Sequence, residues 1–339
     1  MELSVNLLTR KLLPYAVAAL IVLLVCPLIG LQMIPPGQAL RVFFGTAQDD
    51  TLRDILLAHR LPRVLLSFIV GGSLAYVGAA LQVVLRNPLA APSTLGSTQG
   101  GTIGAVLAIT VPALSFRFGP LHAEQLLAMV GSCAALGLIL ALARRPEGTA
   151  SHTLLLTGVT IGILANAVIL FLSYLASPDL LVLMNHWMMG GVDAVGYDDF
   201  AALLPLLLPG LGLIALQAPA LNHLALGEEL ALGHGVDVAA VQGRAFLGAG
   251  LCIAAIVSVT GPISFVGLII PHIVRRLSGH DLRLTLPACW LVGGVFLTAC
   301  DTLARTVIAP REMPVGIITA LAGGPFFIFL LLRSKRQVS

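Results

Sequence analysis

Residues 12–33 read LLPYAVAALIVLLVCPLIGLQM, a run of 22 residues without a charged side chain. At about 1.5 Å per residue, a helix of this length crosses the roughly 30 Å hydrocarbon core of a bilayer. Arg10 and Lys11 precede the run, as basic residues precede a secretory signal. The run is too long for a signal, whose apolar part is about 7–15 residues and ends at small residues suited to cleavage. We therefore predict a transmembrane helix.

The same pattern repeats along the chain. Of 339 residues, 58% are hydrophobic and 10% are charged, too few charges to cover a soluble domain of this size. Two of the runs, 96–112 and 262–273, are short and flanked by Pro and Gly, so we expect them to pack inside protein or line a cavity. The fold class is an all-α polytopic membrane protein of about ten transmembrane helices, at 12–33, 62–85, 96–112, 121–143, 153–176, 198–217, 242–260, 262–273, 285–308 and 314–332.

The basic residues predict the orientation. An even number of crossings places both termini on one side, and a cytoplasmic amino terminus assigns 12 of the 19 Lys and Arg residues to the cytoplasm. No stretch is polar and long enough to form a second domain, so residues 12–334 form one membrane domain, with a cytoplasmic connection at 218–241. The seven remaining basic residues, all arginines, face outward: Arg41, Arg53, Arg60, Arg63, Arg117, Arg305 and Arg311.

Several chemistries lack the residues they need. No phosphate-binding loop of the form GxxxxGK(S/T) is present, so the chain cannot hydrolyse ATP alone, and we predict neither an enzyme nor a resident cofactor or metal. The net charge of +3 is too small and scattered for a nucleic-acid partner. The five cysteines lie in apolar runs without a CxxC pair, and the eight histidines form no HxxxH pair. Residues 184–189, MNHWMM, could contact a metal or haem, but an amphipathic outer segment with an interfacial Trp187 is the simpler reading.

Charged groups within membrane segments are costly and therefore informative. Asp301 and Arg305 are four residues apart on one helix face and can pair, either as a structural ion pair or as a charge presented to an incoming partner. Arg60 and Arg63 flank Pro62, a common first-turn residue, where we expect the second helix to begin. Cations at a helix start oppose the helix dipole, so with Arg305 they indicate a basic outer rim. Interfacial snorkelling of each arginine is the alternative.

The cytoplasmic connection contains LALGEELALGHGV at 224–236. The sequence predicts a short helix with two carboxylates in its first turn, closed by glycine and too short to span the membrane. We expect this helix either to contact a soluble partner or to lie in solvent on the cytoplasmic face of the membrane domain.

Five blocks in order resemble the FecCD-type permease subunits of bacterial ABC importers for ferric siderophores, haem and cobalamin, over residues 12–334. The blocks are RLPR at 60–63; GAALQ at 78–82 running into RNPLA at 86–90; ALGEE at 225–229, closing at Gly235; GPISFVGLIIPH at 261–272; and PVGIITAL at 314–321 followed by GPFF at 324–327.

The resemblance implies a type II ABC importer permease in the bacterial inner membrane. It implies a homodimer embedded in lipid, two cytoplasmic ATPase subunits that bind the ATP, and a periplasmic substrate-binding protein. By position, the coupling helix that docks into the ATPase carries Gly227, Glu228, Glu229 and Gly235. Arg60, Arg63 and Arg305 match the arginines that receive the binding protein, with Arg311 added by location only, and the cytoplasmic gate candidates are Asn87, Ser151 and His152.

The substrate stays open at this point. Family frequency favours an iron chelate, either a ferric siderophore or haem, whereas the Trp187 segment looks closer to cobalamin importers. An ion-coupled secondary transporter is a further alternative that broken helices permit, but mid-membrane carboxylates are scarce.

Overall fold

The computed structural model describes residues 5–45, 49–114, 116–119, 121–143 and 151–335. Helices occupy all ten predicted segments: α1 Val5–Val25, α4 Leu61–Val84, α5 Ser97–Thr110, α6 Ala123–Ala143, α7 Ser151–Leu175, α9 Asp198–Ala225, α11 Val238–Thr260, α12 Val266–Ser278, α13 Leu282–Thr306 and α14 Val315–Lys335. The all-α prediction is confirmed.

Not all of these helices have the length of a membrane span. Among the described residues, seven helices are long and apolar enough to cross a bilayer, so a count of ten crossings is not established. The two segments predicted to be short are short: α5 has 14 residues and α12 has 13. Nine of the 14 residues of α5 and six of the 13 residues of α12 are buried, which agrees with the prediction that these helices pack inside the protein.

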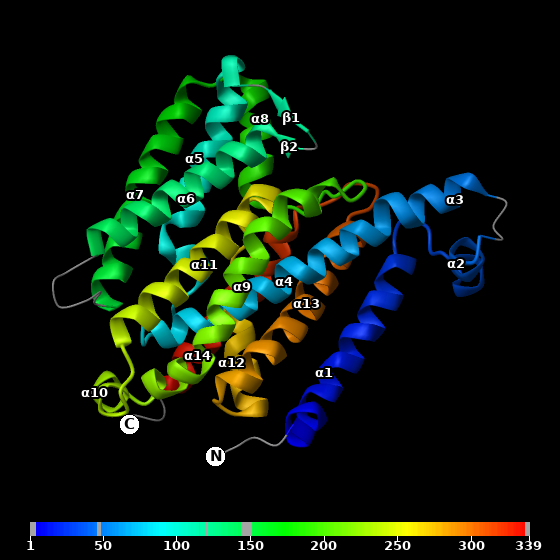
Figure 1. Cartoon of the computed structure of the whole chain (residues 1–339). Coiled ribbons are helices and arrows are strands. Elements are labelled where there is room, and N and C mark those ends of the chain that lie inside the picture. The colour runs from blue at the N-terminus through cyan, green and yellow to red at the C-terminus, as the bar shows by residue number, and fades with distance from the viewer. Residues whose placement is uncertain (1–4, 46–48, 115, 120, 144–150, 336–339) are drawn as a thin grey trace.

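The chain also forms elements that the hydropathy pattern did not reveal. They lie at one end of the bundle, opposite the start of α1 and the end of α14 (Figure 1). The elements are α2 Pro36–Phe43, α3 Asp50–Asp54, the antiparallel pair β1 Arg117–Phe118 and β2 Leu121–His122, and α8 Pro178–Met189. The short cytoplasmic helix that the sequence predicts is present as α10 Glu228–Gly233 and lies at the other end.

A helical segment that was not predicted leads directly into the second predicted helix. The helical backbone runs from Asp50 to Val84, and the side chain of Asp49 caps it by accepting hydrogen bonds from the backbone N–H groups of Thr51 (3.0 Å) and Leu52 (3.2 Å). The α-helix α4 begins at Leu61 with Pro62 in its first turn, as predicted, but it continues a helical segment that starts at Asp50, so Arg60 and Arg63 lie inside a continuous helix.

A π-helical turn, Ile55–Arg60, explains how Pro62 is accommodated. Proline has no N–H, so carbonyl groups one turn earlier lose their partner. The loop before α9 supplies replacements: the Gly196 N–H donates to the Ala58 carbonyl (2.7 Å) and the Tyr197 hydroxyl donates to the Leu57 carbonyl (3.3 Å). The break in the helix is thus a docking point for the 190–197 loop.

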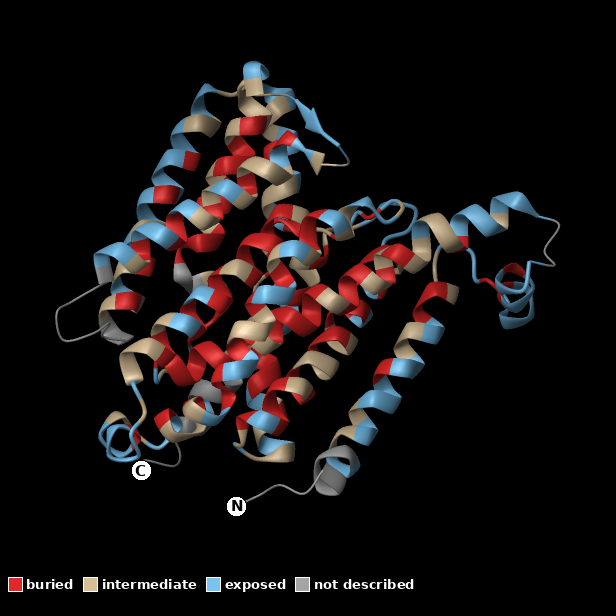
Figure 2. Ribbon diagram, in the orientation of Figure 1, coloured by how far each residue is buried: buried red, intermediate tan, exposed pale blue. Residues whose placement is uncertain are grey.

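The core of the molecule is built around α4 and α11. In the most apolar windows, 89% of α4 and 72% of α11 are buried, against 17% for α1 and α7, so the first pair is central and the second is peripheral (Figure 2). Because α1 and α7 present apolar side chains outward, those faces suit lipid or a second apolar surface.

Helix α9 is also longer than predicted. It continues to Ala225 rather than ending near residue 217, so the connection to α11 is shorter than the predicted 218–241. Only α10 and its flanking turns lie between the two helices. The start of α1, the end of α14 and α10 share one end of the molecule (Figure 1), as the prediction of both termini on one side requires.

Candidate functional site

A network of charged side chains joins α4 to α13 at the end opposite α10. Arg63 donates from Nε to Asp301 Oδ1 (3.1 Å) and Oδ2 (3.2 Å), and from Nη2 to Oδ1 (3.1 Å). The Nε atom of Arg305 lies 3.2 Å from Asp301 Oδ2. The predicted Asp301–Arg305 pair is confirmed, and Arg63 is a third member that spacing along one helix could not reveal.

Arg63, Asp301 and Arg305 form a buried charged triad, and removing one of its members would cost considerable free energy. The side chain of Asp301 is fully buried, and those of Arg63 and Arg305 are 12% and 7% exposed. A carboxylate removed from water requires charged partners and hydrogen bonds to offset its lost hydration. Two guanidinium groups around one carboxylate leave the triad with one excess positive charge.

Two carboxylates from separate loops approach that excess charge. Glu312, between α13 and α14, accepts a hydrogen bond from Arg63 Nη1. Asp193, between α8 and α9, lies 4.0 Å from Arg63 Nη2. Glu312 is 55% exposed and Asp193 is 61% exposed, so both contacts face solvent. Sequence reasoning missed both residues, because no pattern relates positions 193 and 312 to position 63.

Arg60 has a different environment from the other two arginines. Its Nη1 atom donates to the carbonyls of Pro27 and Leu28 (both 3.3 Å), and its Nη2 atom donates to the carbonyl of Gln32 (2.7 Å). The guanidinium thus holds the turn after α1 against α4. Backbone carbonyl dipoles, rather than a carboxylate, stabilise its positive charge.

These groups surround a cleft of about 550 Å³. Arg60, Arg63 and Arg305 all line it, so the structure brings together three of the four arginines predicted for docking. Arg305 is mostly buried, whereas an outer rim had been expected to expose it. Arg311 is exposed on the following loop and does not line this cleft. The docking role of the four residues remains a prediction.

The packing of α4 on α13 places the triad. A Cβ atom on Gly71 would lie 2.4 Å from the Gly293 carbonyl oxygen, so only glycine permits this approach of the two backbones. One turn away, the rings of Phe68 and Trp290 pack edge to face with centroids 5.2 Å apart. The close helix contact brings Arg63 within hydrogen-bonding distance of Asp301.

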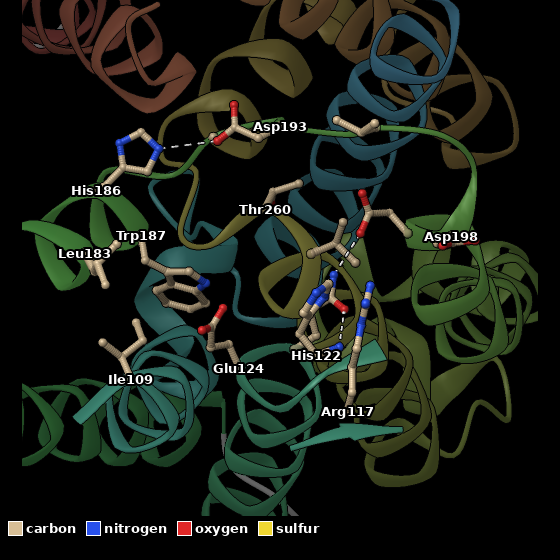
Figure 3. A pocket seen from close by; sticks show the side chains of 15 residues that line it. Ile109, Arg117, His122, Glu124, Leu183, His186, Trp187, Asp193, Asp198 and Thr260 are labelled. Carbon is tan, nitrogen blue, oxygen red and sulfur yellow. Dashed lines mark hydrogen bonds and ion pairs between the residues drawn. The ribbon is translucent and has the colours of Figure 1, made fainter. Parts of the chain in front are cut away.

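A second cavity at the same end, of about 540 Å³, lies between α5, α6, α8 and the 190–197 loop (Figure 3). His186 Nε2 lies 3.4 Å from Asp193 Oδ2, and Gln125 donates to Asp199 (2.8 Å). Trp187 also lines it, and Met184 is buried, which agrees with an amphipathic outer segment. Within the described ranges no three His, Cys, Asp or Glu side chains gather to hold a metal ion.

The predicted cytoplasmic helix forms as α10. Glu228 and Glu229 occupy its first turn, where carboxylates complement the helix dipole. Gly227 (φ 126°) and Gly235 (φ 75°) flank it in backbone conformations that favour glycine. Glu228 accepts a hydrogen bond from Gln242 of α11 (3.3 Å), whereas Glu229 is exposed, so the two carboxylates have different surroundings.

Three exposed leucines lie on or beside α10: Leu226 (68%), Leu230 (55%) and Leu232 (61%). Apolar side chains beside an exposed carboxylate at one end of the bundle are typical of a protein contact. The coupling role of this helix remains a prediction.

The predicted gate residues lie in two places: Asn87 follows α4, and Ser151 and His152 are the first two residues of α7. Asn87 stabilises the turn after α4, where its Oδ1 accepts from the Leu89 N–H (2.9 Å). Ser151 and His152 begin α7, and their side chains lie outside what the structure describes. A gating role for these residues stays a prediction.

A bundle of apolar helices with charged side chains gathered at its two ends is typical of a multi-pass membrane protein. The model of the FecCD transport family matches residues 18–333, and the chain belongs to that family. It is therefore an ABC importer permease of the inner membrane, a transport protein rather than a catalytic enzyme.

Named relatives support the same class. The hemin transport permease HmuU of Yersinia pestis is 38% identical over 94% of this chain and 96% of its own length. The cobalamin import permease BtuC of Halobacterium salinarum is 41% identical over 83% of this chain and 74% of its own length. A solved chain described as a metal-chelate type ABC transporter in an inward-facing conformation has a TM-score of 0.81 at 27% identity, covering 96% of this chain and 99% of that one.

Proposed function

We propose that this chain carries an iron chelate, either haem or a ferric siderophore, from the periplasm to the cytoplasm. Transport is driven by ATP hydrolysis on a partner subunit, since the chain has no phosphate-binding loop of its own. The working unit is a homodimer with a path between the two copies, two ATPase subunits on one side and a substrate-binding protein on the other.

We choose an iron chelate as the substrate class because of the match to the hemin permease. It extends over nearly the whole of both chains at 38% identity, so it includes the helices on either side of any path as well as the ends. The match to the Halobacterium cobalamin permease has a higher identity but covers 74% of that protein.

Each end of the molecule has a partner in this proposal. The binding protein docks at the cleft of Arg60, Arg63 and Arg305, because cations in a partly solvated cleft attract acidic side chains. The ATPase docks at α10, where Glu229 and the neighbouring leucines are exposed. The cytoplasmic gate includes Asn87, Ser151 and His152.

Cobalamin import by the same machinery is the second candidate. The Halobacterium relative and the vitamin B12 import permease of Klebsiella pneumoniae, 35% identical over 93% of this chain, both favour it. The MNHWMM segment of α8 also resembles that group. The ion-coupled transporter is set aside, because an ABC importer permease draws on ATP.

Uptake measurements distinguish the substrates. Cells lacking their own importers receive this permease with its ATPase and binding protein, and radiolabelled ferric siderophore, haem and cobalamin are offered separately. We expect uptake of an iron chelate that stops when the ATPase carries an inactivating substitution. Uptake of cobalamin alone would keep the importer and overturn the substrate, and uptake without an active ATPase would overturn the mechanism.

A further inference from the structure

The guanidinium group of Arg63 makes contacts with one buried carboxylate and one exposed carboxylate. Its Nε and Nη2 atoms face the buried Asp301, while Nη1 faces Glu312, which is 55% exposed. The inner contact joins two packed helices and lies out of water. The outer contact joins a helix to a loop and lies at the surface, so it is the one that a solute or a protein can reach.

The charges of the cleft are already balanced within the chain. Three guanidinium groups (Arg60, Arg63 and Arg305) and two carboxylates (Asp193 and Glu312) line the cleft, and the carboxylate of Asp301 lies beneath it, so the formal charges sum to zero. A carboxylate that arrives at Arg63, which already has carboxylate partners, would therefore add an unpaired negative charge there unless one of the chain's own carboxylates left. Asp301 is fully buried and held by two arginines, so Glu312 and Asp193 are the ones free to leave.

Glu312 is the direct competitor. It makes a hydrogen bond with Arg63, whereas Asp193 lies at 4.0 Å from Arg63 and also approaches His186 at 3.4 Å. A partner carboxylate that reaches Arg63 Nη1 needs the position that the Glu312 carboxylate occupies. Both are the same chemical group, so one can replace the other with little change in the geometry at Arg63.

We propose that Glu312 is an internal placeholder, which an acidic side chain of the docking protein displaces from Arg63 when it binds. This inference rests on the proposed docking of a binding protein at this cleft. Displacement frees the 307–314 loop from α4 while leaving the buried Arg63–Asp301–Arg305 triad intact.

The loop connects the exchange to α14. Met313 donates its N–H to the Ala304 carbonyl of α13 (3.2 Å), and Gly316 in the first turn of α14 donates to the Gly190 carbonyl (3.1 Å). After exchange these backbone contacts remain, so the loop loses its tie to α4 and keeps its ties to α13 and to the end of α8. Docking thereby changes which helices hold the start of α14.

The variant Glu312→Gln tests the exchange. The purified permease in nanodiscs is titrated with the binding protein that supports uptake in the assay above. Removing the competitor should tighten binding roughly twofold to fivefold, the range that about 0.4–1 kcal/mol for a solvent-exposed ion pair allows. Asp54→Asn is the matched control, since it removes one exposed carboxylate from the same end outside the cleft, and its affinity should equal that of the wild type.

Glu312→Asp provides a second test that keeps the charge but shortens the reach to Arg63. It should also tighten binding, by less than Glu312→Gln. Unchanged or weaker binding by folded Glu312→Gln, or equal tightening by Asp54→Asn, would overturn the exchange. Failure of the wild-type permease to bind any binding protein would instead overturn the proposed function. The melting temperature of each variant shows whether it is folded.

Discussion

At the scale of single residues, Asp301 decides the structure of the outer end. Its side chain is fully buried and receives two guanidinium groups, one from its own helix and one from α4. The sequence predicted the pair of Asp301 with Arg305, because the two residues are four apart on one helix. It left open whether the pair was structural or presented to a partner, and the burial of Asp301 makes the inner part of the network structural.

Asp301→Asn should destabilise the protein strongly. The substitution leaves Arg63 and Arg305 close together without the carboxylate that neutralises them, and breaking a buried ion pair costs about 3–5 kcal/mol. We expect a marked fall in the melting temperature of the detergent-purified protein. Asp54→Asn, an exposed carboxylate at the same end, should change it little. A melting temperature equal to that of the wild type would show that the triad contributes no net stability.

At the scale of elements, close contact between glycines sets the distance between α4 and α13. A Cβ atom on Gly71 would meet the Gly293 carbonyl oxygen and the Leu297 Cβ atom, both at 2.4 Å. Either the helices separate or one of them shifts, and both movements alter the approach of Arg63 to Asp301.

Gly71→Ala should therefore lower stability by about 1–3 kcal/mol, the usual cost of overpacking a close-packed interface. The control is Gly212→Ala in α9, where nothing lies within 4 Å of the added Cβ atom. That change should be neutral or stabilising by roughly 0.5–1 kcal/mol, because alanine is the better helix former. Thermal unfolding of the two variants side by side checks both signs, and an equal effect would refute the steric argument.

Helix α10 is the other element with a specific prediction. Replacing Glu228 and Glu229 together by alanine should leave the permease inserted and folded but uncouple ATP hydrolysis from transport. Loss of about 1–1.4 kcal/mol of docking energy would weaken the ATPase contact roughly fivefold to tenfold. ATPase activity and uptake are measured on the same proteoliposomes.

The single variants separate the two roles. Glu228 bonds to Gln242 and holds α10 against α11, whereas Glu229 is exposed, so Glu229→Ala should account for most of the lost contact with the ATPase. Normal coupling in the double variant would mean that α10 is only a solvated connection.

At the scale of the whole molecule, charge is confined to the two ends and the helices between them are apolar. The outer end carries arginines against the usual preference for cytoplasmic cations. In the proposed importer, those that remain exposed steer an acidic partner over distances of about 10 Å at moderate salt.

Arg311→Glu tests this steering without touching the triad. Arg311 is exposed and outside the cleft, so its reversal should slow association of the binding protein and make the rate less sensitive to salt. The control is Arg53→Glu on α3, an exposed arginine at the same end. Association rates at low and high salt check the prediction, and equal effects of both reversals would assign the steering to the overall charge rather than to Arg311.

Much of the fold was readable from the sequence for a simple reason. A bilayer requires apolar segments whose backbone is hydrogen-bonded internally, so the positions of the apolar runs predicted helices at all ten segments, including the short α5 and α12. The π-helical turn before Pro62 was not readable, because its carbonyls are satisfied by Gly196 and Tyr197, far away in the chain. The helical segment before α4 was missed for that reason.

The sequence by itself determined the class of the protein, the approximate positions of ten of its helices, the ion pair of Asp301 with Arg305 and the short cytoplasmic helix. Each of these follows from local spacing or from the requirement that apolar runs avoid water. Tertiary structure alone decided that Arg63 completes the triad, that Arg305 is buried within it and that Glu312 occupies the outer edge of Arg63. Ion pairs between residues far apart in the sequence depend on how the helices pack, and the local sequence does not specify the spatial distance between two helices.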